Sequence, residues 1–198
     1  GAPWTLIVYM FGLKKNKNQI DLNKLEKSAP DIKIVLNKIN EYLCSHISKQ
    51  IQAGADTVQI FDSWAGLIPN EKLSDYCYNP NKKIVDFCKK NKIPVICFPR
   101  GINKNYLEFA KTVNPDCLSL DYEIDLVWAK NHLSDYCLQG GMDPKILFKK
   151  ESEIFNEIDR LLNLFKGQAY IFNLGHGLLP ETNPNVLQKV VERVNNFK

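Results

Sequence analysis

Hydrophobic and polar positions alternate along the chain in blocks, each long enough for one strand or one helix. Between residues 31 and 53 apolar side chains recur every three or four positions, which is the spacing of an amphipathic helix. Further helices are predicted over residues 79–91, 103–113, 123–132, 143–165 (with a break near Lys150) and 183–197. These helical ranges alternate with shorter apolar runs, and that order is typical of an α/β protein.

Six short apolar runs are predicted to be strands. They span residues 4–10, 57–61, 94–98, 117–120, 135–139 and 169–174. The runs are apolar throughout rather than at alternate positions, so we expect both faces of each strand to be buried, as in a parallel sheet covered by helices. An open doubly wound sheet and a (β/α)8 barrel are both compatible with this pattern.

Polar residues and glycines follow directly after these predicted strands. The segments are Asp62-Ser63-Trp64-Ala65-Gly66, Pro99-Arg100-Gly101, Gly140-Gly141 and Gly175-His176-Gly177. In a TIM barrel the loops after the strands form the active face, whereas the G-x-G-x-x-G fingerprint of a dinucleotide fold follows none of these strands. The pattern therefore favours an α/β TIM (β/α)8 barrel with about six βα units in this chain.

The length of the chain bears on its domain organisation. A full barrel takes about 250 residues, and this chain has 198. We expect residues 1–198 to form a single domain, the C-terminal part of a (β/α)8 barrel that lacks its N-terminal strands.

Composition and charge narrow the class of protein. Hydrophobic residues make up 44% and charged residues 24% of the chain, which is ordinary for a globular protein. The net charge is only +4, and lysine-rich stretches such as KKNKNQ are interpreted as solvated loops and helix faces rather than a nucleic-acid surface. No apolar run reaches the ~18 residues of a membrane span, and no signal-like start is present, so a cytoplasmic protein is expected.

The cysteine pattern predicts buried thiols rather than a metal site. Six cysteines occur, at positions 44, 77, 88, 97, 117 and 137, and no two have the C-x-x-C spacing of zinc ligands. Because most of them lie in apolar runs, we expect reduced, structural side chains.

Six segments carry a resemblance to a known family. In chain order they are GAPWTLIVYM, AGADTVQIFDSWAGLIP, CFPRG, LSLDYEID, LQGGMDP and FNLGHGLLPETNP, and together they resemble the C-terminal portion of uroporphyrinogen decarboxylase. The resemblance covers essentially the whole chain. It implies a (β/α)8 barrel, a homodimer and a cytoplasmic lyase of porphyrin and haem biosynthesis. The implied reaction removes carbon dioxide from the four acetate side chains of uroporphyrinogen III, giving coproporphyrinogen III, without a metal or organic cofactor.

The same resemblance assigns three site residues. Tyr9 matches a pocket tyrosine whose hydroxyl binds a substrate carboxylate or a proton carrier, and Ser63 matches a residue suited to a substrate carboxylate. His176 is expected to donate to a carboxylate or to relay protons near neutral pH. We expect the glycines on both sides of His176 to allow unusual backbone conformations and close approach of a ligand. The family's key aspartate and its paired arginines belong to an N-terminal segment that similar proteins have and this sequence does not include.

Other polar residues allow two interpretations. Arg100 follows a predicted strand, where it can bind a substrate carboxylate through two hydrogen bonds or form a salt bridge between loops. Asp121 and Glu123 fit either a general acid/base pair or the capped start of a helix. His46 and His132 lie within or at the end of predicted helices and are interpreted as structural.

Two alternatives to a decarboxylase remain. The first is a truncated, non-catalytic relic or porphyrin-binding partner, because the segment with the key aspartate is not part of the sequence. The second is a zinc- and corrinoid-linked methyltransferase of the same superfamily, which needs thiolate and histidine ligands grouped at the strand ends. None of the six cysteines lies beside His176 in the sequence.

Overall fold

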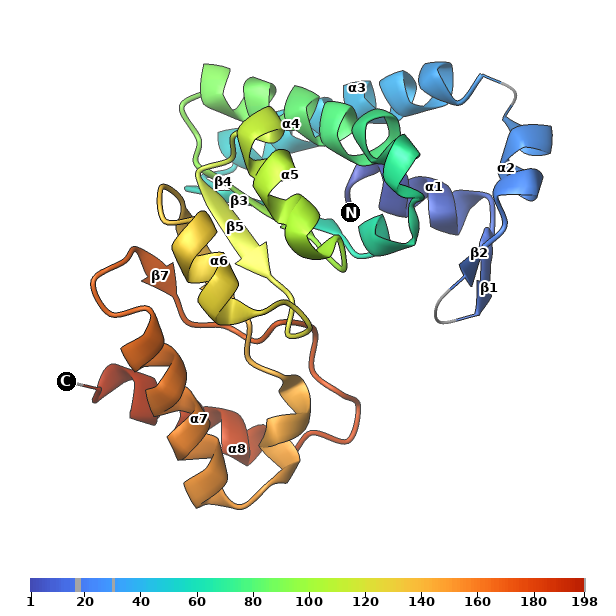
Figure 1. Cartoon of the computed structure of the whole chain (residues 1–198). Coiled ribbons are helices and arrows are strands. Elements are labelled where there is room, and N and C mark those ends of the chain that lie inside the picture. The colour runs from blue at the N-terminus through green and yellow to red at the C-terminus, as the bar shows by residue number, and fades with distance from the viewer. Residues whose placement is uncertain (17–18, 30, 198) are drawn as a thin grey trace. The chain divides into compact units, whose positions relative to one another are not determined.

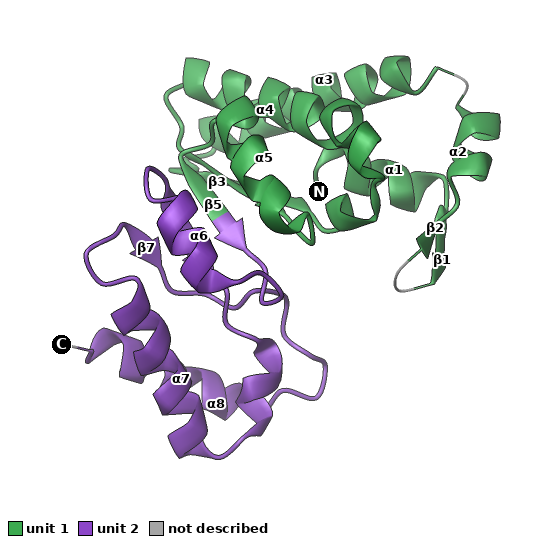
Figure 2. Cartoon of the chain, viewed as in Figure 1, with its two compact units in different colours: residues 1–118 green, residues 119–198 purple. Residues whose placement is uncertain are grey.

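The computed structural model describes residues 1–16, 19–29 and 31–197 and has an α/β fold (Figure 1). The chain divides into two compact units, residues 1–118 (unit 1) and 119–198 (unit 2), shown in Figure 2. Among the described residues, five strands form a parallel sheet in the order β3-β4-β5-β6-β7. The boundary between the units falls within β5, Cys117–Leu120.

Unit 1 contains the first five helices and the first strands of the sheet. Its helices are α1 (Pro3–Met10), α2 (Leu22–Ser28), α3 (Ile32–Gln52), α4 (Asn79–Lys90) and α5 (Tyr106–Val113). Its strands are β1 (Lys14–Asn16), β2 (Gln19–Ile20), β3 (Val58–Asp62), β4 (Val95–Pro99) and the start of β5. Between β3 and α4 the chain forms two short 3-10 turns, Ala65–Leu67 and Asn70–Lys72, and a π-helical turn, Ser74–Tyr78.

The parallel register of unit 1 brings the carboxyl ends of β3 and β4 level with each other. β3 pairs with β4 from Val58 opposite Val95 to Asp62 opposite Pro99, and β4 pairs with β5 at Ile96–Cys117 and Cys97–Leu118. The residues that follow Asp62 and Pro99 therefore leave the sheet at the same edge.

The long amphipathic helix was predicted correctly. α3 covers Ile32–Gln52, and Leu36, Ile39 and Ile47 are buried along one side of it. The Asp31 carboxylate accepts a hydrogen bond from the Ile34 N–H at 3.3 Å and caps the helix. The apolar spacing was informative here because one side of this helix packs against the rest of unit 1.

The strand predicted over residues 4–10 is wrong, because this segment is helix α1. Pro3 occupies the first turn, where its missing N–H leaves no helical hydrogen bond unmade. Trp4, Ile7 and Val8 are buried, whereas Tyr9 is 63% exposed, which is a helical and not an alternating pattern. The described part of the chain thus contributes five parallel strands rather than six, and Tyr9 lies on a helix rather than at a strand end.

The described part of the lysine-rich segment after α1 forms short strands rather than a loop or a helix face. β1 and β2 form an antiparallel hairpin with Lys14 opposite Ile20 and Asn16 opposite Gln19. Its tip, residues 17–18, lies outside the described residues. The strands are short and largely exposed, so their polar side chains gave no alternating pattern from which a hairpin could be inferred.

Unit 2 continues the alternation of strands and helices. It contains the end of β5, α6 (Leu126–His132), β6 (Cys137–Gly140), a 3-10 turn (Pro144–Phe148), α7 (Glu151–Leu164), β7 (Tyr170–Ile171) and α8 (Pro184–Asn195). β6 pairs in parallel with β7 at Leu138–Tyr170 and Gln139–Ile171. A further parallel bridge joins Met142 to Leu174 beyond the strand ends. The predicted break near Lys150 is confirmed, because α7 begins at the next residue.

Helix α6 begins three residues later than predicted because Asp125 caps it. The Asp125 carboxylate accepts hydrogen bonds from the N–H groups of Val127 (2.9 Å) and Trp128 (3.1 Å). We expect Asp125→Ala to destabilise the protein by about 1 kcal/mol, measured by thermal or urea unfolding, because two N–H groups at the helix start lose their acceptor. Asp125→Asn keeps an accepting oxygen and should lose much less. Equal losses in the two variants would rule out capping as the source of the effect.

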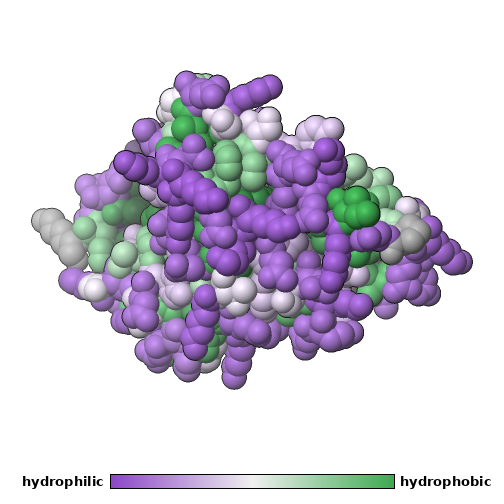
Figure 3. Space-filling view, turned by 90° about the horizontal axis from the view of Figure 1, so that it is seen from above, coloured by the Kyte–Doolittle hydropathy of each residue, from purple (hydrophilic) through white to green (hydrophobic). Residues whose placement is uncertain are grey.

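The surface has the mixture of polar and apolar side chains that is usual for a globular protein. The face drawn in Figure 3 is mostly hydrophilic, with smaller hydrophobic areas between the polar side chains.

All six cysteines are free, and Cys77, Cys88, Cys97 and Cys117 are buried. Burial raises the pKa of the Cys88 thiol to about 11, so it stays protonated at neutral pH. None of the described helices combines the length and apolar character needed to cross a bilayer.

Candidate functional site

The loops after β3 and β4 pack closely against each other. The Gly66 N–H donates to the Arg100 carbonyl oxygen at 2.8 Å, and the Arg100 N–H donates to the Asp62 carbonyl oxygen at 3.2 Å. A Cβ atom on Gly66 would lie 2.6 Å from the Gly101 carbonyl oxygen, so only glycine fits at position 66. We call residues 62–66 and 99–101 the β3/β4 loop cluster; it contains Ser63 and Arg100.

Both ends of helix α1 contact this loop cluster at Trp64. The Trp4 indole N–H donates to the Trp64 carbonyl oxygen at 3.1 Å. The Tyr9 ring meets the Trp64 ring edge-on, with centroids 6.2 Å apart and planes at 77°. The structure thereby brings together three of the predicted site residues, Tyr9, Ser63 and Arg100, in unit 1.

A buried carboxylate, that of Asp62, joins the loop cluster to two helices. Asp62 is 1% exposed, and its carboxylate accepts hydrogen bonds from the Thr5 hydroxyl (2.8 Å) and the Asn81 amide (3.1 Å). Thr5 belongs to α1 and Asn81 to α4, so this one side chain connects two helices to the end of β3. Burial raises the pKa of the Asp62 carboxyl above its ordinary value, and the hydrogen bonds from Thr5 and Asn81 oppose the rise.

The Arg100 side chain does not make the salt bridge that was one of its two interpretations. Within the described ranges no carboxylate lies within ion-pair distance of its guanidinium group, and its buried Nε atom has no hydrogen-bond partner. The neighbouring loops are joined instead by the Arg100 backbone. A buried donor without an acceptor is suited to a ligand that brings one, such as a carboxylate.

His176 lies in unit 2, in the loop that follows β7, and is exposed. The preceding residue fixes this loop: the Gly175 N–H donates to the Met142 carbonyl oxygen at 2.8 Å. A Cβ atom on Gly175 would lie 2.4 Å from the Tyr122 backbone nitrogen, whereas one on Gly177 would meet nothing within 4 Å. The prediction of unusual backbone conformations for both glycines is wrong, because neither has a positive φ. Gly175 is required by the close approach of residues 121–122.

The remaining polar candidates have local structural partners. The Asp121 carboxylate accepts hydrogen bonds from the Glu123 (2.9 Å) and Ile124 (3.1 Å) N–H groups and so stabilises the turn before α6. The imidazole of His132 stacks on Trp128, and its Nδ1 lies 2.9 Å from the Trp128 carbonyl oxygen. His46 is exposed on α3. The acid/base interpretation of Asp121 and Glu123 stays a prediction.

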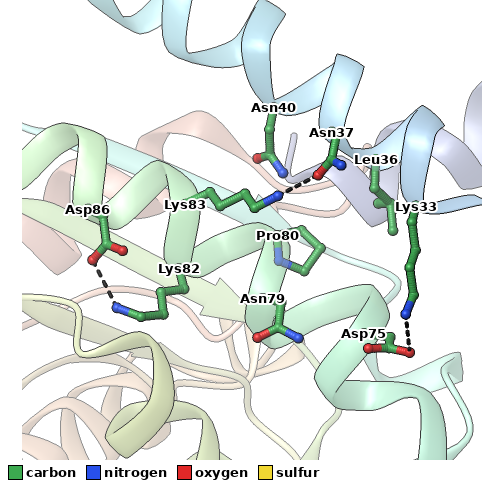
Figure 4. A pocket seen from close by; sticks show the side chains of 10 residues that line it. All are labelled: Lys33, Leu36, Asn37, Asn40, Asp75, Asn79, Pro80, Lys82, Lys83 and Asp86. Carbon is green, nitrogen blue, oxygen red and sulfur yellow. Dashed lines mark hydrogen bonds and ion pairs between the residues drawn. The ribbon is translucent and has the colours of Figure 1, made fainter.

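A cavity of about 460 Å³ lies elsewhere in unit 1, between α3, the π-helical turn and α4 (Figure 4). It contains none of the predicted site residues. Its lysines already have polar partners, as the dashed lines and neighbouring side chains in Figure 4 show: Lys33 with Asp75, Lys82 with Asp86 and Lys83 with Asn37. The charges of Lys33 and Lys82 are paired with carboxylates, which weakens the attraction of the cavity for an anionic ligand, whereas Lys83 meets only a neutral amide.

No group of three or more His, Cys, Asp or Glu side chains able to hold a metal ion occurs in the part of the chain that the structure describes. Besides the buried Asp62 carboxylate, the side chains of the β3/β4 loop cluster supply the Ser63 hydroxyl, the Trp64 indole N–H and the Arg100 guanidinium group. Their chemistry is that of hydrogen-bond donors to an anion.

Two residues of the loop cluster and its surroundings were not singled out from the sequence. Trp64 is in contact with Trp4 and Tyr9, and the Lys14 Nζ lies 4.5 Å from the centroid of its ring. The signal for Trp64 was its place directly after Ser63. Lys14 had no signal, because it lies in a lysine-rich segment and its contact joins residues 50 positions apart.

The family profile and the curated relatives both point to one family. The family profile described as uroporphyrinogen decarboxylase (URO-D) matches residues 1–197. Uroporphyrinogen decarboxylases from Jannaschia sp. and Orientia tsutsugamushi are each 34% identical to this chain over 98% and 100% of its length, respectively. That from Cereibacter sphaeroides is 32% identical over 98% of it. The chain spans 58–59% of the length of these relatives.

Among solved structures, a thiamine phosphate pyrophosphorylase from Pyrococcus furiosus is 12% identical, with 80% of this chain and 90% of that chain covered and a TM-score of 0.34. A similarity of that size does not define a shared fold. The profile match and the relatives do define a family, whose barrel this chain represents in part: the chain belongs to the uroporphyrinogen decarboxylase family.

Proposed function

We propose that this chain supplies a large part of a uroporphyrinogen decarboxylase, a lyase that converts uroporphyrinogen III to coproporphyrinogen III by removing four carboxyl groups. The observation that carries the proposal is the β3/β4 loop cluster, in which Ser63 and Arg100 follow the carboxyl ends of parallel strands while Tyr9 of α1 contacts the neighbouring Trp64 ring. The family match over residues 1–197 supports it. A cytoplasmic homodimer is part of the proposal and rests on the family resemblance alone.

The chemistry explains why donors to anions are needed. A pyrrole acetate loses carbon dioxide once a proton on the ring makes the ring an electron sink. The bond between the methylene and carboxyl carbons then breaks, its electron pair enters the ring, and a second proton converts the exocyclic methylene to a methyl group. The site must therefore hold a polycarboxylate, stabilise a cationic ring and deliver protons.

The four candidate residues fit these tasks. The hydroxyl groups of Tyr9 and Ser63 donate hydrogen bonds to substrate carboxylates, and Arg100 supplies a positive charge with an unused donor. His176 donates to a carboxylate or relays protons, since an imidazole titrates near neutral pH. The substrate's own ring accepts the electrons, so the proposed reaction assigns no step to a cofactor.

The deciding experiment is anaerobic turnover of uroporphyrinogen III by this chain, alone and mixed with the N-terminal segment of a relative. We expect activity in the mixture, because the chain spans 58–59% of its relatives. A folded mixture that binds uroporphyrin without turnover would contradict the decarboxylase and support a porphyrin-binding protein. A mixture that neither binds nor turns over would support a relic.

We expect Ser63→Ala to raise the KM of the active mixture by about tenfold with a smaller change in kcat, because one hydrogen bond to a substrate carboxylate is lost. Ser45→Ala, at an exposed position on α3, is the matched control and should leave both constants unchanged. If the two variants behave alike, Ser63 does not bind the substrate.

A further inference from the structure

The base of the β1–β2 hairpin is fixed to the end of α1. Leu13, the residue before β1, is fully buried. Its N–H donates to the Val8 carbonyl oxygen at 2.9 Å, and its carbonyl oxygen accepts from the Asp21 N–H at 2.8 Å. The backbone of Lys14, the next residue, is therefore held beside α1, although the hairpin itself is exposed.

The two lysines of β1 differ in their electrostatic partners. Lys15 forms an ion pair with Asp21, with Nζ 3.2 Å from the carboxylate oxygen. The Lys14 ammonium lies instead over the ring of Trp64, 4.5 Å from its centroid. Within residues 1–16, 19–29 and 31–197, no carboxylate lies within ion-pair distance of Lys14. Among the described residues, Lys14 thus keeps a positive charge that no carboxylate pairs with.

The Trp64 ring places this charge beside the candidate site. Trp64 follows Ser63 directly, and the Tyr9 ring meets it edge-on. An exposed cation–π contact is weak, whereas a charge-assisted hydrogen bond to a carboxylate is considerably stronger. An arriving carboxylate can therefore draw the ammonium off the ring face, since the lysine side chain is long and its three donors rotate freely.

We propose that Lys14 binds a carboxylate of the tetrapyrrole substrate, next to the hydroxyl groups of Tyr9 and Ser63. The inference rests on the proposed function and adds to it a substrate-binding residue from the hairpin. A lysine suits this position because its ammonium group can bind acetate and propionate carboxylates without the fixed planar geometry that arginine requires.

The test compares two lysines of one strand. Uroporphyrin III, the stable oxidised form that keeps all the carboxylates of the substrate, is titrated into the 198-residue chain and binding is followed by tryptophan quenching. We expect Lys14→Gln to weaken binding by about tenfold. Lys15→Gln removes the same charge from the same hairpin and should change the dissociation constant by less than about twofold. Unchanged melting temperatures would confirm that both variants are folded.

The outcomes separate this inference from the proposed function. Absence of uroporphyrin binding by the unmodified chain, and by its mixture with the N-terminal segment of a relative, would overturn the proposed function and the inference with it. Normal binding that Lys14→Gln and Lys15→Gln weaken equally would overturn only the inference and assign the effect to net charge. Unchanged binding with altered sedimentation in Lys14→Gln would also overturn it, because Lys14 would then pair with a carboxylate of another protein chain. A selective loss in Lys14→Gln supports it.

Discussion

Asp62→Ala is expected to destabilise the protein by about 3 kcal/mol, because it removes the acceptor of two buried donors. The Thr5 hydroxyl and the Asn81 amide both donate to this carboxylate, and both residues are buried, so neither donor can turn to bulk water in its place. The missing carboxyl group also leaves a small cavity at the end of β3. Urea unfolding of the chain measures the change.

Asp62→Asn is the informative control for this variant. The amide has nearly the shape of the carboxyl group, and one of its atoms still accepts from Asn81 while the Thr5 hydroxyl can rotate to accept from the other. We expect a loss below about 1.5 kcal/mol. An alanine variant as stable as the original would contradict the claim that Asp62 connects α1 and α4 to the loop cluster.

The difference in stability between the original protein and Asp62→Asn is expected to depend on pH. Because burial raises the pKa of Asp62 in the folded state, the folded chain binds this proton more tightly than the unfolded chain does. The stability contributed by Asp62 is therefore greatest below the unfolded pKa of about 3.9 and falls as pH rises through the folded pKa. Relative to Asp62→Asn, the original protein should lose stability as pH rises from acid toward neutral. A relative gain would show that the hydrogen bonds outweigh burial and lower the pKa.

The amphipathic helices and the parallel strands could be predicted because burial fixes the spacing of their apolar residues. α3 and α4 follow the predicted ranges closely, and β3, β4 and β5 lie within a residue of theirs. Residues 4–10 could not be assigned in this way, because a short run that is apolar throughout fits a buried helix as well as a strand. Pro3 at the start of the run was the available sign of a helix.

Two signals marked the candidate site in the sequence. Ser63, Arg100 and His176 all come after parallel strands, and the family resemblance assigned Tyr9, Ser63 and His176. Trp64 and Lys14 depend on a contact between a hairpin and a loop 50 residues later, which no local pattern encodes. Asp62 was visible as a polar residue at a strand end, but its partners Thr5 and Asn81 come from two helices far away in the sequence.

The glycines around His176 were expected to matter for a reason that the structure does not bear out. Both were expected to relax the backbone, yet neither adopts a positive φ. Glycine is needed at position 175 for a different reason, since the backbone of Tyr122 comes so close that a Cβ atom would lie 2.4 Å from its nitrogen. Gly177 has open space around it. The two flanking positions should therefore respond very differently to one methyl group.

Gly175→Ala is expected to destabilise the chain by about 3 kcal/mol, whereas Gly177→Ala should change stability by no more than about 0.5 kcal/mol. The methyl group at position 175 meets backbone atoms at 2.4 Å and 2.8 Å, which cannot rotate away as a flexible side chain would. Either the loop moves away from residues 121–122 or its hydrogen bond to the Met142 carbonyl oxygen breaks, and both displace His176. Thermal unfolding measures the stability, and turnover of the active mixture measures the displacement. If alanine is tolerated equally at both positions, close packing does not fix the His176 loop. If Gly175→Ala unfolds more easily yet keeps full turnover, the position of His176 does not matter to the reaction.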